Sequence, residues 1–346
     1  VLHQHVGLSS HFVWTNRSKE SLTLDLKRDE AGDIMERLLQ QADVLVQNLA
    51  PGAAARLGLS FEALHAKYPR LIVCDISGYG EGGPYQDKKA YDLLIQSESG
   101  FLSVTGTADD PVKAGCSIAD ISAGMYAYSA ILNALLLRQK TGLGSRLDVS
   151  MLESMVEWMG FPMYYAFEGA APPVRAGAAH ASIYPYGPFP TGDGNTIMLG
   201  LQNEREWRVF CAQVLRQAEL AEDPRFATNS LRTANREALR ALIVAAFADL
   251  SVQQVTDRLE DAQIANARVN DMAGVWDHPQ LRARDRWSQV DSPAGTLPAL
   301  LPPASSNAFA PRMAAVPAVG QNTDAVLASL GYAPEQVARF HASEVV

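Results

Sequence analysis

A helix-length stretch between residues 118 and 138 carries apolar side chains around its whole circumference, and it constrains the fold more than any other feature. Its apolar members are Ile121, Ala123, Met125, Tyr126, Ala127, Ala130, Ile131, Leu132, Ala134, Leu135, Leu136 and Leu137. A helix without a polar face has no side that favours solvent, so we expect it to lie inside the molecule. Ser129, Asn133 and Arg138 interrupt the run before it reaches the roughly 18 apolar residues of a membrane span, which argues against a membrane segment.

Asp120 stands at the N-terminal entrance of this predicted helix, and two interpretations of it are open. In the first it caps the helix: Ser117 and Asp120 have the spacing of a capping box, although Glu or Gln is usual at the second position of that pair. An acid in the first turn also complements the helix dipole by about 0.3–1 kcal/mol. In the second, a carboxylate held against backbone N–H groups stays ionised and can attack an activated acyl group. The spacing alone favours the cap.

Strand and helix patterns alternate through the first half of the chain. Leu22, Leu24 and Leu26 alternate with polar residues and predict a half-buried strand. Further predicted elements are helices at 29–41 and 62–67 and strands at 43–46, 70–76 and 146–150. This order predicts an α/β fold with a parallel sheet covered on both faces, and ligands at the carboxyl ends of its strands. Asn48 and residues 77–83 are expected at those ends.

The run from Gly78 to Gly83 satisfies G-x-G-x-x-G and follows a predicted strand, as a dinucleotide-binding fingerprint does. That fingerprint should open directly into a helix. Here the polar turn 84–89 follows instead, so a glycine-rich loop at the active site is the better interpretation.

The second half of the chain predicts a smaller domain and an arm. An aromatic-rich helix at 152–167 suggests core or a subunit interface. After a linker at 172–182, a strand at 196–200 and helices at 204–215, 235–250 and 252–260 follow, then a Pro- and Ala-rich tail at 292–321 and a closing helix at 322–340. We therefore predict a large α/β domain at 1–183, a small α+β domain at 184–284 and a C-terminal arm at 285–346 that returns to the large domain.

Charge and cysteine content exclude several functional classes. The net charge of −9 argues against a nucleic-acid partner, which needs a basic face. Cys74, Cys116 and Cys211 have no metal-ligand spacing, so we predict no metal site and reduced thiols. No charged-then-apolar leader is visible, and the predicted location is the cytoplasm.

Several motifs follow one another in a known order. They are Lys89-Ala-Tyr-Asp92, Gln96-Ser-Glu-Ser-Gly100, Val104-Thr-Gly106, Ile118-Ala-Asp120-Ile-Ser-Ala-Gly124, Ala134-Leu-Leu-Leu-Arg138 and Thr141-Gly-Leu-Gly144. In these motifs the chain resembles the class III coenzyme A transferases, the family of formyl-CoA transferase and carnitine CoA-transferase. Residues 145–153, 157–165 and 183–194 are most similar to its branch for mesaconyl-CoA and other C4–C5 dicarboxylates. The resemblance covers nearly the whole chain.

The resemblance implies roles for particular residues. Asp120 matches the family's catalytic aspartate, which moves the interpretation from cap to nucleophile, with both roles compatible. The positions that contact coenzyme A in relatives are Asn48, Leu49, Arg56, Leu57, Lys89 and Tyr91. Arg56 and Lys89 suit phosphates and the two leucines suit the adenine; without the resemblance, both cations would be solvated surface charges.

The resemblance further implies a Rossmann-like large domain in an interlocked homodimer, and an N-terminal βαβ unit that is absent from this sequence. It implies transfer of coenzyme A from an acyl-CoA to a free carboxylic acid through an aspartyl-CoA thioester, with no bound cofactor. Amides of the 78–83 loop, Gly80 among them, or of the small domain's loop at 200–204 are candidate donors to the tetrahedral oxyanion. Arg175 and His180, with the hydroxyls of Tyr184 and Tyr186, are candidates to receive the far carboxylate of a dicarboxylate.

Two alternatives remain. An α-methylacyl-CoA racemase would need a His immediately before Asp92, where this chain has Tyr91. A non-catalytic CoA-binding protein would keep the nucleotide residues but would not need Asp120.

Overall fold

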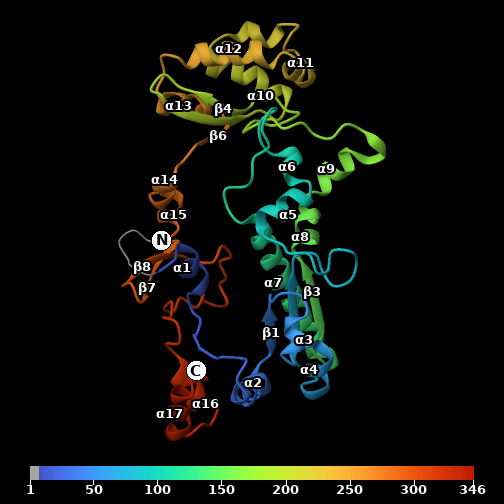
Figure 1. Ribbon diagram of the computed structural model, residues 1–346. Helices are drawn as coiled ribbons and strands as arrows, with labels where there is room; N and C mark the ends of the chain where they lie inside the picture. Colours follow the sequence, from blue (N-terminus) through green and yellow to red (C-terminus); the bar gives the residue numbers. More distant parts are fainter. Residues whose placement is uncertain (1–7) are drawn as a thin grey trace. The chain divides into compact units, whose positions relative to one another are not determined.

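Strand β2 (Ile72–Ser77), helix α7 (Ile118–Thr141) and strand β3 (Arg146–Ser150) each run from one structural unit of the chain into the other. The computed structural model of the protein describes residues 8–346 (Figure 1). Unit 1 holds the chain up to Cys74 with Ile131–Arg146 and Met272–Val346, and unit 2 holds Asp75–Ala130 and Leu147–Asp271. Both units therefore combine distant stretches of sequence. The division at residues 183 and 284 stays a prediction.

The parallel sheet has the strand order β1-β2-β3, where β1 is Val44–Gln47. In unit 1, α2 (Asp29–Gln41) and α4 (Phe61–Lys67) pack against β2 through buried leucines at 39, 59, 64 and 71 and through Val73. The short helix α3 (Ala53–Arg56) lies between β1 and α4 in sequence. The predicted α/β class, the parallel sheet and its predicted strands and helices are confirmed, within one or two residues at their ends.

The strand predicted at Leu22–Leu26 is wrong. Residues 21–25 have no strand partner, because their backbone groups bond to the start of α16 (Thr323–Ser329) and to the carbonyl of Val345. Ser21 N and Thr23 N donate to the side-chain oxygens of Asn322 and Thr323, over 2.9 and 3.1 Å. Leu22 and Leu24 do pack against a buried cluster of unit 1, so the alternation correctly marked a half-buried segment.

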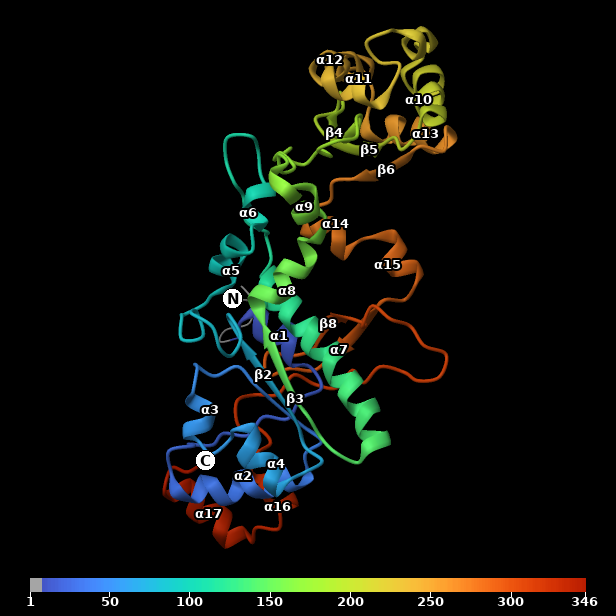
Figure 2. The ribbon, with the colours of Figure 1, turned by 90° about the vertical axis from the view of Figure 1, so that its right-hand side faces the viewer.

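The C-terminal helices α16 and α17 (Pro334–Ala342) pack on α2 in unit 1 (Figure 2). The Tyr332 hydroxyl between them donates to Asp33 Oδ2 on α2 over 2.5 Å, and the Arg37 guanidinium lies 4.1 Å from the centre of the Tyr332 ring. The single closing helix that the sequence predicts is thus two, separated by a turn in which Gly331 has a positive φ of 86°.

The sequence predicts a tail without regular structure at residues 292–321, but part of it forms a strand. Strand β8 (Leu297–Leu300) pairs antiparallel with β7 (Trp287–Val290), and a turn from Ser292 to Gly295 joins them. The sequence pattern did not predict this hairpin, because Pro298 and Ala299 interrupt the run of larger apolar residues in β8. The other helices of unit 1 are α1 (Ser10–Asn16), α14 (Met272–Trp276) and α15 (Pro279–Ala283).

In unit 2, helices α5 (Asp92–Glu98), α6 (Phe101–Val104) and α8 (Met151–Trp158) surround the first turn of α7. Ile95, Ala119 and Met155 are fully buried where α5, α7 and α8 meet. The aromatic-rich helix predicted at 152–167 breaks at Met159 into α8 and α9 (Gly160–Tyr165). Phe161 and Tyr164 on α9 are 69% and 82% exposed, so the core interpretation of these aromatics is wrong for the single chain.

The C-terminal part of unit 2 is an antiparallel sheet covered by helices. Strands β4 (Tyr186–Pro190), β5 (Thr196–Gly200) and β6 (Ala265–Arg268) pair in that order, with Tyr186 opposite Gly200. Helices α10 (Glu204–Val209), α11 (Asn229–Ala234) and α12 (Arg236–Phe247) lie on one side of this sheet (Figures 1 and 2). The π-helical stretch Phe210–Leu215, the 3-10 helix Ala218–Glu222 and α13 (Val252–Asp261) complete it. The small α+β fold is as predicted.

Buried Arg232 joins the segments of this small fold. Its guanidinium donates to Glu204 Oε2 at 2.8 Å and Oε1 at 3.0 Å, and to the carbonyls of Tyr184 and Phe226, each at 3.0 Å. The same group lies 5.0 Å from the centre of the buried Trp207 ring. One side chain therefore ties the start of β4, the start of α10 and α11 together.

Helix α7 is not enclosed, although its apolar composition predicts that it should be. Its buried positions are small residues, Ala119, Ser122, Ala123, Ala127 and Ala134, which line one stripe. Met125, Tyr128, Leu132 and Leu136 follow a second stripe and are 43–60% exposed in the single chain. By length and composition α7 would pass for a membrane span, as would the sharply bent pair α12–α13. That is weak support for a membrane location, because core helices of soluble proteins meet the same criteria.

Candidate active site

Asp120 lies in the first turn of α7 with its side chain exposed, next to a second carboxylate. Asp92, the first residue of α5, accepts hydrogen bonds on Oδ1 from Ala119 N at 2.7 Å and Asp120 N at 3.3 Å. The cap on α7 thus comes from another helix, and the capping-box spacing of Ser117 did not reveal it. The positive end of the α7 dipole favours negative charge at both aspartates.

Asp92 is a site residue that the sequence pattern did not reveal. It lies in the Lys89–Asp92 motif, but its function as a cap depends on a contact across 27 or 28 positions in the chain. Its Oδ2 accepts a further hydrogen bond from Gln96 Nε2 at 2.6 Å. Asp92 is therefore held from both sides and fixes the backbone at Asp120.

Tyr91 and Lys89 precede this cap in the same unit. Tyr91 occupies the N-cap position of α5 and is 72% exposed, and Lys89 is exposed as well. Because Asp92 bonds to the backbone of Asp120, the structure brings the Lys89–Asp92 motif to the first turn of α7. Two of the six predicted coenzyme A residues thus lie in the segment that caps the candidate nucleophile.

The glycine-rich loop 78–83 packs against the same segment. A Cβ on Gly78 would lie 2.2 Å from Ala90 Cβ, and Gly80 has a positive φ of 83°. No helix opens after the loop, since turns continue to α5, and this removes the dinucleotide interpretation. The loop needs its glycines to approach the Lys89–Asp92 motif and to turn.

Three amides of this loop already have acceptors. Gly80 N donates to Ser77 Oγ at 2.9 Å, Glu81 N to Asp148 Oδ2 at 3.0 Å and Gly82 N to Gln86 Oε1 at 3.1 Å. An oxyanion could accept hydrogen bonds from these three groups only if the loop rearranged. Gly80 as an oxyanion donor stays a prediction, and this conformation does not favour it.

The small domain's loop after β5 is bonded internally too. Gln202 N donates to Glu206 Oε2 at 2.7 Å, and Asn203 exchanges two hydrogen bonds of 2.9 Å with Glu206. These contacts cap α10. Gly200 is the single glycine of this loop. To move as a lid, the loop would have to break the hydrogen bonds between its own residues and Glu206.

His180 and Tyr186 are brought together, while Arg175 is engaged elsewhere. The His180 and Tyr186 rings stack with centres 5.3 Å apart, and His180 Nδ1 accepts from Ser182 N and Ile183 N at 3.2 and 3.1 Å. The ring proton of the imidazole is therefore on Nε2. Arg175 donates to the carbonyls of residues 107 and 108, each at 2.7 Å. These contacts fit a structural role for Arg175 and a donor role for His180.

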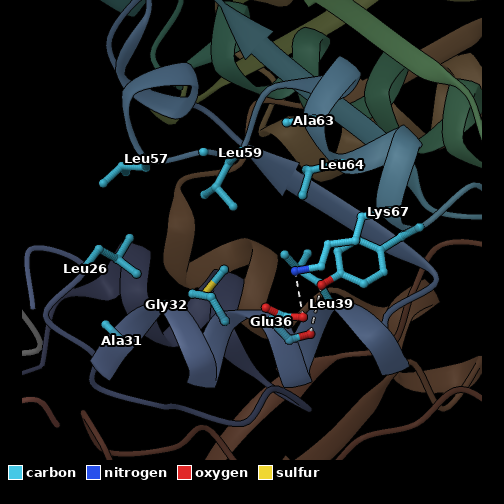
Figure 3. Close-up of a pocket in the computed structure, with 13 residues that line it drawn as sticks. Leu26, Ala31, Gly32, Glu36, Leu39, Leu57, Leu59, Ala63, Leu64 and Lys67 are labelled. Carbon is cyan, nitrogen blue, oxygen red and sulfur yellow. Dashed lines mark hydrogen bonds and ion pairs between the residues drawn. The ribbon is translucent and has the colours of Figure 1, made fainter. Parts of the chain in front are cut away.

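The remaining predicted residues lie in unit 1. Asn48 and Leu49 directly follow β1, so they stand at the carboxyl end of a parallel strand as expected. Arg56 ends α3, and Leu57 follows it. Leu57 lines a cavity of about 260 Å³ that Leu26 and Gly32 border from the other side (Figure 3). At one end Lys67 Nζ meets Glu36 Oε1 at 2.6 Å.

Metal ligands do not gather anywhere in residues 8–346: no group of three or more His, Cys, Asp and Glu side chains there could hold an ion.

Known proteins resemble this chain over most of its length. The sequence model of CoA-transferase family III matches residues 2–323. A succinate–glutarate CoA-transferase of Agrobacterium fabrum is 34% identical over 84% of this chain and 72% of its own. A succinyl-CoA:mesaconate CoA-transferase of Haloarcula hispanica is 31% identical over 82% of this chain and 72% of its own. The crystal structure of a CAIB/BAIF family protein from Brucella suis superposes with a TM-score of 0.83 at 32% identity, covering 93% of this chain and 84% of that one.

Proposed function

This chain belongs to CoA-transferase family III, and on that premise we propose that it moves coenzyme A between short C4–C5 dicarboxylates through a thioester on Asp120. One observation carries the proposal: Asp120 is exposed in the first turn of α7, where Asp92 fixes its backbone. The relatives named for succinate, glutarate and mesaconate support the substrate class, with branched and unsaturated acids such as mesaconate, itaconate and citramalate as first candidates.

The proposed reaction exchanges acyl bonds of similar energy. An oxygen of Asp120 attacks the donor thioester, forming a mixed anhydride and releasing the coenzyme A thiolate. The thiolate attacks the Asp120 carbonyl of the anhydride, which expels the donor acid and leaves aspartyl-CoA. The acceptor carboxylate attacks this thioester, forming a second anhydride, and the returning thiolate takes its acyl group and frees Asp120. Alignment of the partners is the protein's main contribution, worth effective molarities of about 10⁵–10⁸ M in well-oriented systems.

The coenzyme A residues are proposed in two groups. In unit 1, Arg56 meets phosphates, Asn48 bonds the adenine edge, and Leu49 and Leu57, which are 41% and 38% exposed, offer it apolar contact. In unit 2, Lys89 and Tyr91 contact the end of coenzyme A near Asp120, a role that the exposure of both side chains supports.

For the far carboxylate we propose His180 and Tyr186. The Nε2–H of the imidazole and the Tyr186 hydroxyl supply two donors, and their stacked rings hold both donors in place. Arg175 remains a weaker candidate, since Nε and Nη2 already donate to carbonyls.

Intact mass tests the proposed function. Incubation of the protein with succinyl-CoA, without an acceptor acid, should add the mass of coenzyme A less one water. Subsequent addition of glutarate or mesaconate should remove the adduct and produce the new acyl-CoA. If coenzyme A binds by thermal shift and yet no adduct forms and no acid is converted, the binding-only alternative holds instead.

We further propose that two copies of the chain form a homodimer that covers the exposed stripe of α7. Met125, Tyr128, Leu132 and Leu136 follow helical spacing, and a monomeric soluble protein rarely exposes such a patch. The exposed aromatics of α9 support the same conclusion.

Leu136→Glu is expected to weaken the dimer by roughly 100-fold or more, because a carboxylate would lose its water in an apolar interface. Sedimentation velocity over a concentration series measures this. Leu231→Glu makes the same change at an exposed leucine of α11, outside this stripe, and should leave the sedimenting mass that of the wild-type dimer. A wild-type monomer at all concentrations contradicts the dimer.

The proposed location is the cytoplasm. Cys116 and Cys211 take part in no disulfide bond, which is the state in which a reducing compartment would keep them. Burial raises the pKa of the Cys211 thiol to about 12, so that thiol is unreactive at neutral pH.

A further inference from the structure

Gln96 is fully buried on α5, and both ends of its amide are hydrogen-bonded. Its Nε2 donates to Asp92 Oδ2 at 2.6 Å, and its Oε1 accepts from Ala114 N at 2.9 Å. Glutamine is seldom fully buried, and a buried amide destabilises the protein unless its polar atoms have partners. The site thus makes specific use of both the donor and the acceptor of this side chain.

These bonds continue to the candidate nucleophile. Asp92 passes the connection on, because its Oδ1 accepts from Ala119 N and Asp120 N. A continuous path therefore leads from the backbone at Ala114, through Gln96 and Asp92, to the backbone at Asp120. It joins α5 to both ends of the segment that leads into α7.

We propose that Gln96 is a positioning residue for the transfer reaction: it holds Asp92 on the first turn of α7 and so sets the place of Asp120. The inference rests on the proposed function of Asp120. No other uncharged standard side chain of this length fits the position, because Ala114 N–H needs an acceptor and the Asp92 Oδ2 oxygen needs a donor.

Glutamate at position 96 would replace the hydrogen-bond donor that faces Asp92 with an acceptor. It keeps the acceptor for Ala114 but opposes a second carboxylate to Asp92, and two carboxylates at this separation cannot both stay ionised. Either Asp92 moves, or the pair takes up a proton. Ionisable groups on the segments packed around α5 include Asp120 in the first turn of α7, Lys113 and Cys116 before it, and Glu153 and Glu157 on α8. Tyr79, Lys89 and Tyr91 lie in the segment before α5, while α6 has no ionisable group. Glu98 on α5 itself is paired with Lys88.

Asparagine at position 92 offers a way to repair that reversal. In the double variant Asp92→Asn/Gln96→Glu, the new amide at position 92 donates to the new carboxylate at position 96, while the amide oxygen still accepts from the α7 backbone. The carboxylate then accepts both from that amide and from Ala114 N. All the hydrogen bonds of the path are restored, with the opposite direction between positions 92 and 96.

The test is a double-mutant cycle on the rate of aspartyl-CoA formation from succinyl-CoA, measured by mass at pH 8 and pH 6. Gln96→Glu should slow the rate about 100-fold at pH 8, and less at pH 6, where the carboxylate pair can hold a proton. Introduced into the Asp92→Asn variant, the same Gln96→Glu change should raise the rate by about 10-fold or more above that of Asp92→Asn alone. The KM for succinyl-CoA should change less than about 3-fold throughout.

Two results would overturn the inference: a wild-type rate in Gln96→Glu, or an equal loss from Gln96→Glu with Asp and with Asn at position 92. Gln254→Glu, the same change in the capping box of α13, is the matched control and should react as the wild type does. If the wild-type protein forms no adduct, the proposed function fails by itself. The unfolding midpoints of the wild type, the two single variants and the double variant then test the path. If Gln96→Glu lowers the midpoint with Asp at position 92 but raises it with Asn there, the path is supported; if the two changes have additive effects on the midpoint, it is rejected.

Discussion

Replacing Asp120 with asparagine is expected to lower CoA-transfer turnover by roughly 10⁴-fold or more, because an amide cannot form the anhydride or the thioester. The change is nearly isosteric, and the α7 cap is made by Asp92, so the fold should persist. Initial rates with succinyl-CoA and a dicarboxylate measure the loss. Thermal shift with free coenzyme A should be unaltered.

Two further variants make this result specific. Asp120→Ala excludes activity recovered through deamidation of the new asparagine. Asp109→Asn removes an exposed acid from the loop before α7 and should retain the wild-type rate. Turnover in Asp120→Asn and Asp120→Ala at about a tenth of the wild-type rate would exclude Asp120 as the nucleophile.

Arg232→Met is expected to destabilise the protein by about 3–5 kcal/mol, because two buried carbonyls are left without a donor, at about 1–3 kcal/mol each, while the partly exposed Glu204 carboxylate only loses its ion pair. Methionine fills much of the volume but donates nothing, so the carbonyls of Tyr184 and Phe226 lose their partner. Denaturant unfolding measures the change. Arg225→Met, which removes an exposed pair with Asp223, should leave the midpoint almost unaltered.

The pH dependence adds an independent check on this network. The hydrogen bonds from Arg232 hold the pKa of Glu204 below its usual range. A carboxyl whose folded pKa is depressed stabilises the protein above its unfolded pKa, about 4.3, and loses that contribution as the pH falls through the folded value. The wild type should therefore lose stability below about pH 4.3 more steeply than Arg232→Met. Equal slopes would exclude the Glu204–Arg232 pair as a source of stability.

Periodicity predicted the sheet and helices of the α/β core because each element there buries one side against its neighbours. Periodicity failed where a segment's backbone bonds to side chains, and where a helix packs through small residues. Leu22 and Leu24 read as a strand, although their segment bonds to Asn322 and Thr323. Helix α7 read as enclosed, although its close contacts are made by alanines and its larger side chains face outward.

Some residues of the candidate site could be predicted from the sequence and others could not. The family resemblance pointed to Asp120, and the structure brings Lys89 and Tyr91 to the same turn through Asp92. Asp92 and Gln96 could not be assigned roles from sequence, because each acts through a hydrogen bond that the fold creates between α5 and the segment before α7. The two loops proposed as oxyanion donors looked available in sequence, yet their amides bond to nearby side chains.

The contact between residues 21–25 and the C-terminal helices has a consequence for synthesis. Thr23 N and its acceptor Thr323 are 300 positions apart, so Thr23 cannot find its partner until synthesis has passed residue 323. At about 5–20 residues per second, Leu22 and Leu24 wait on the order of 15–60 s without their packing partners. Unit 2 is complete at Asp271, before α16 and α17 emerge. Unit 2 can therefore fold during synthesis while residues 21–25 still lack their partners at Asn322 and Thr323.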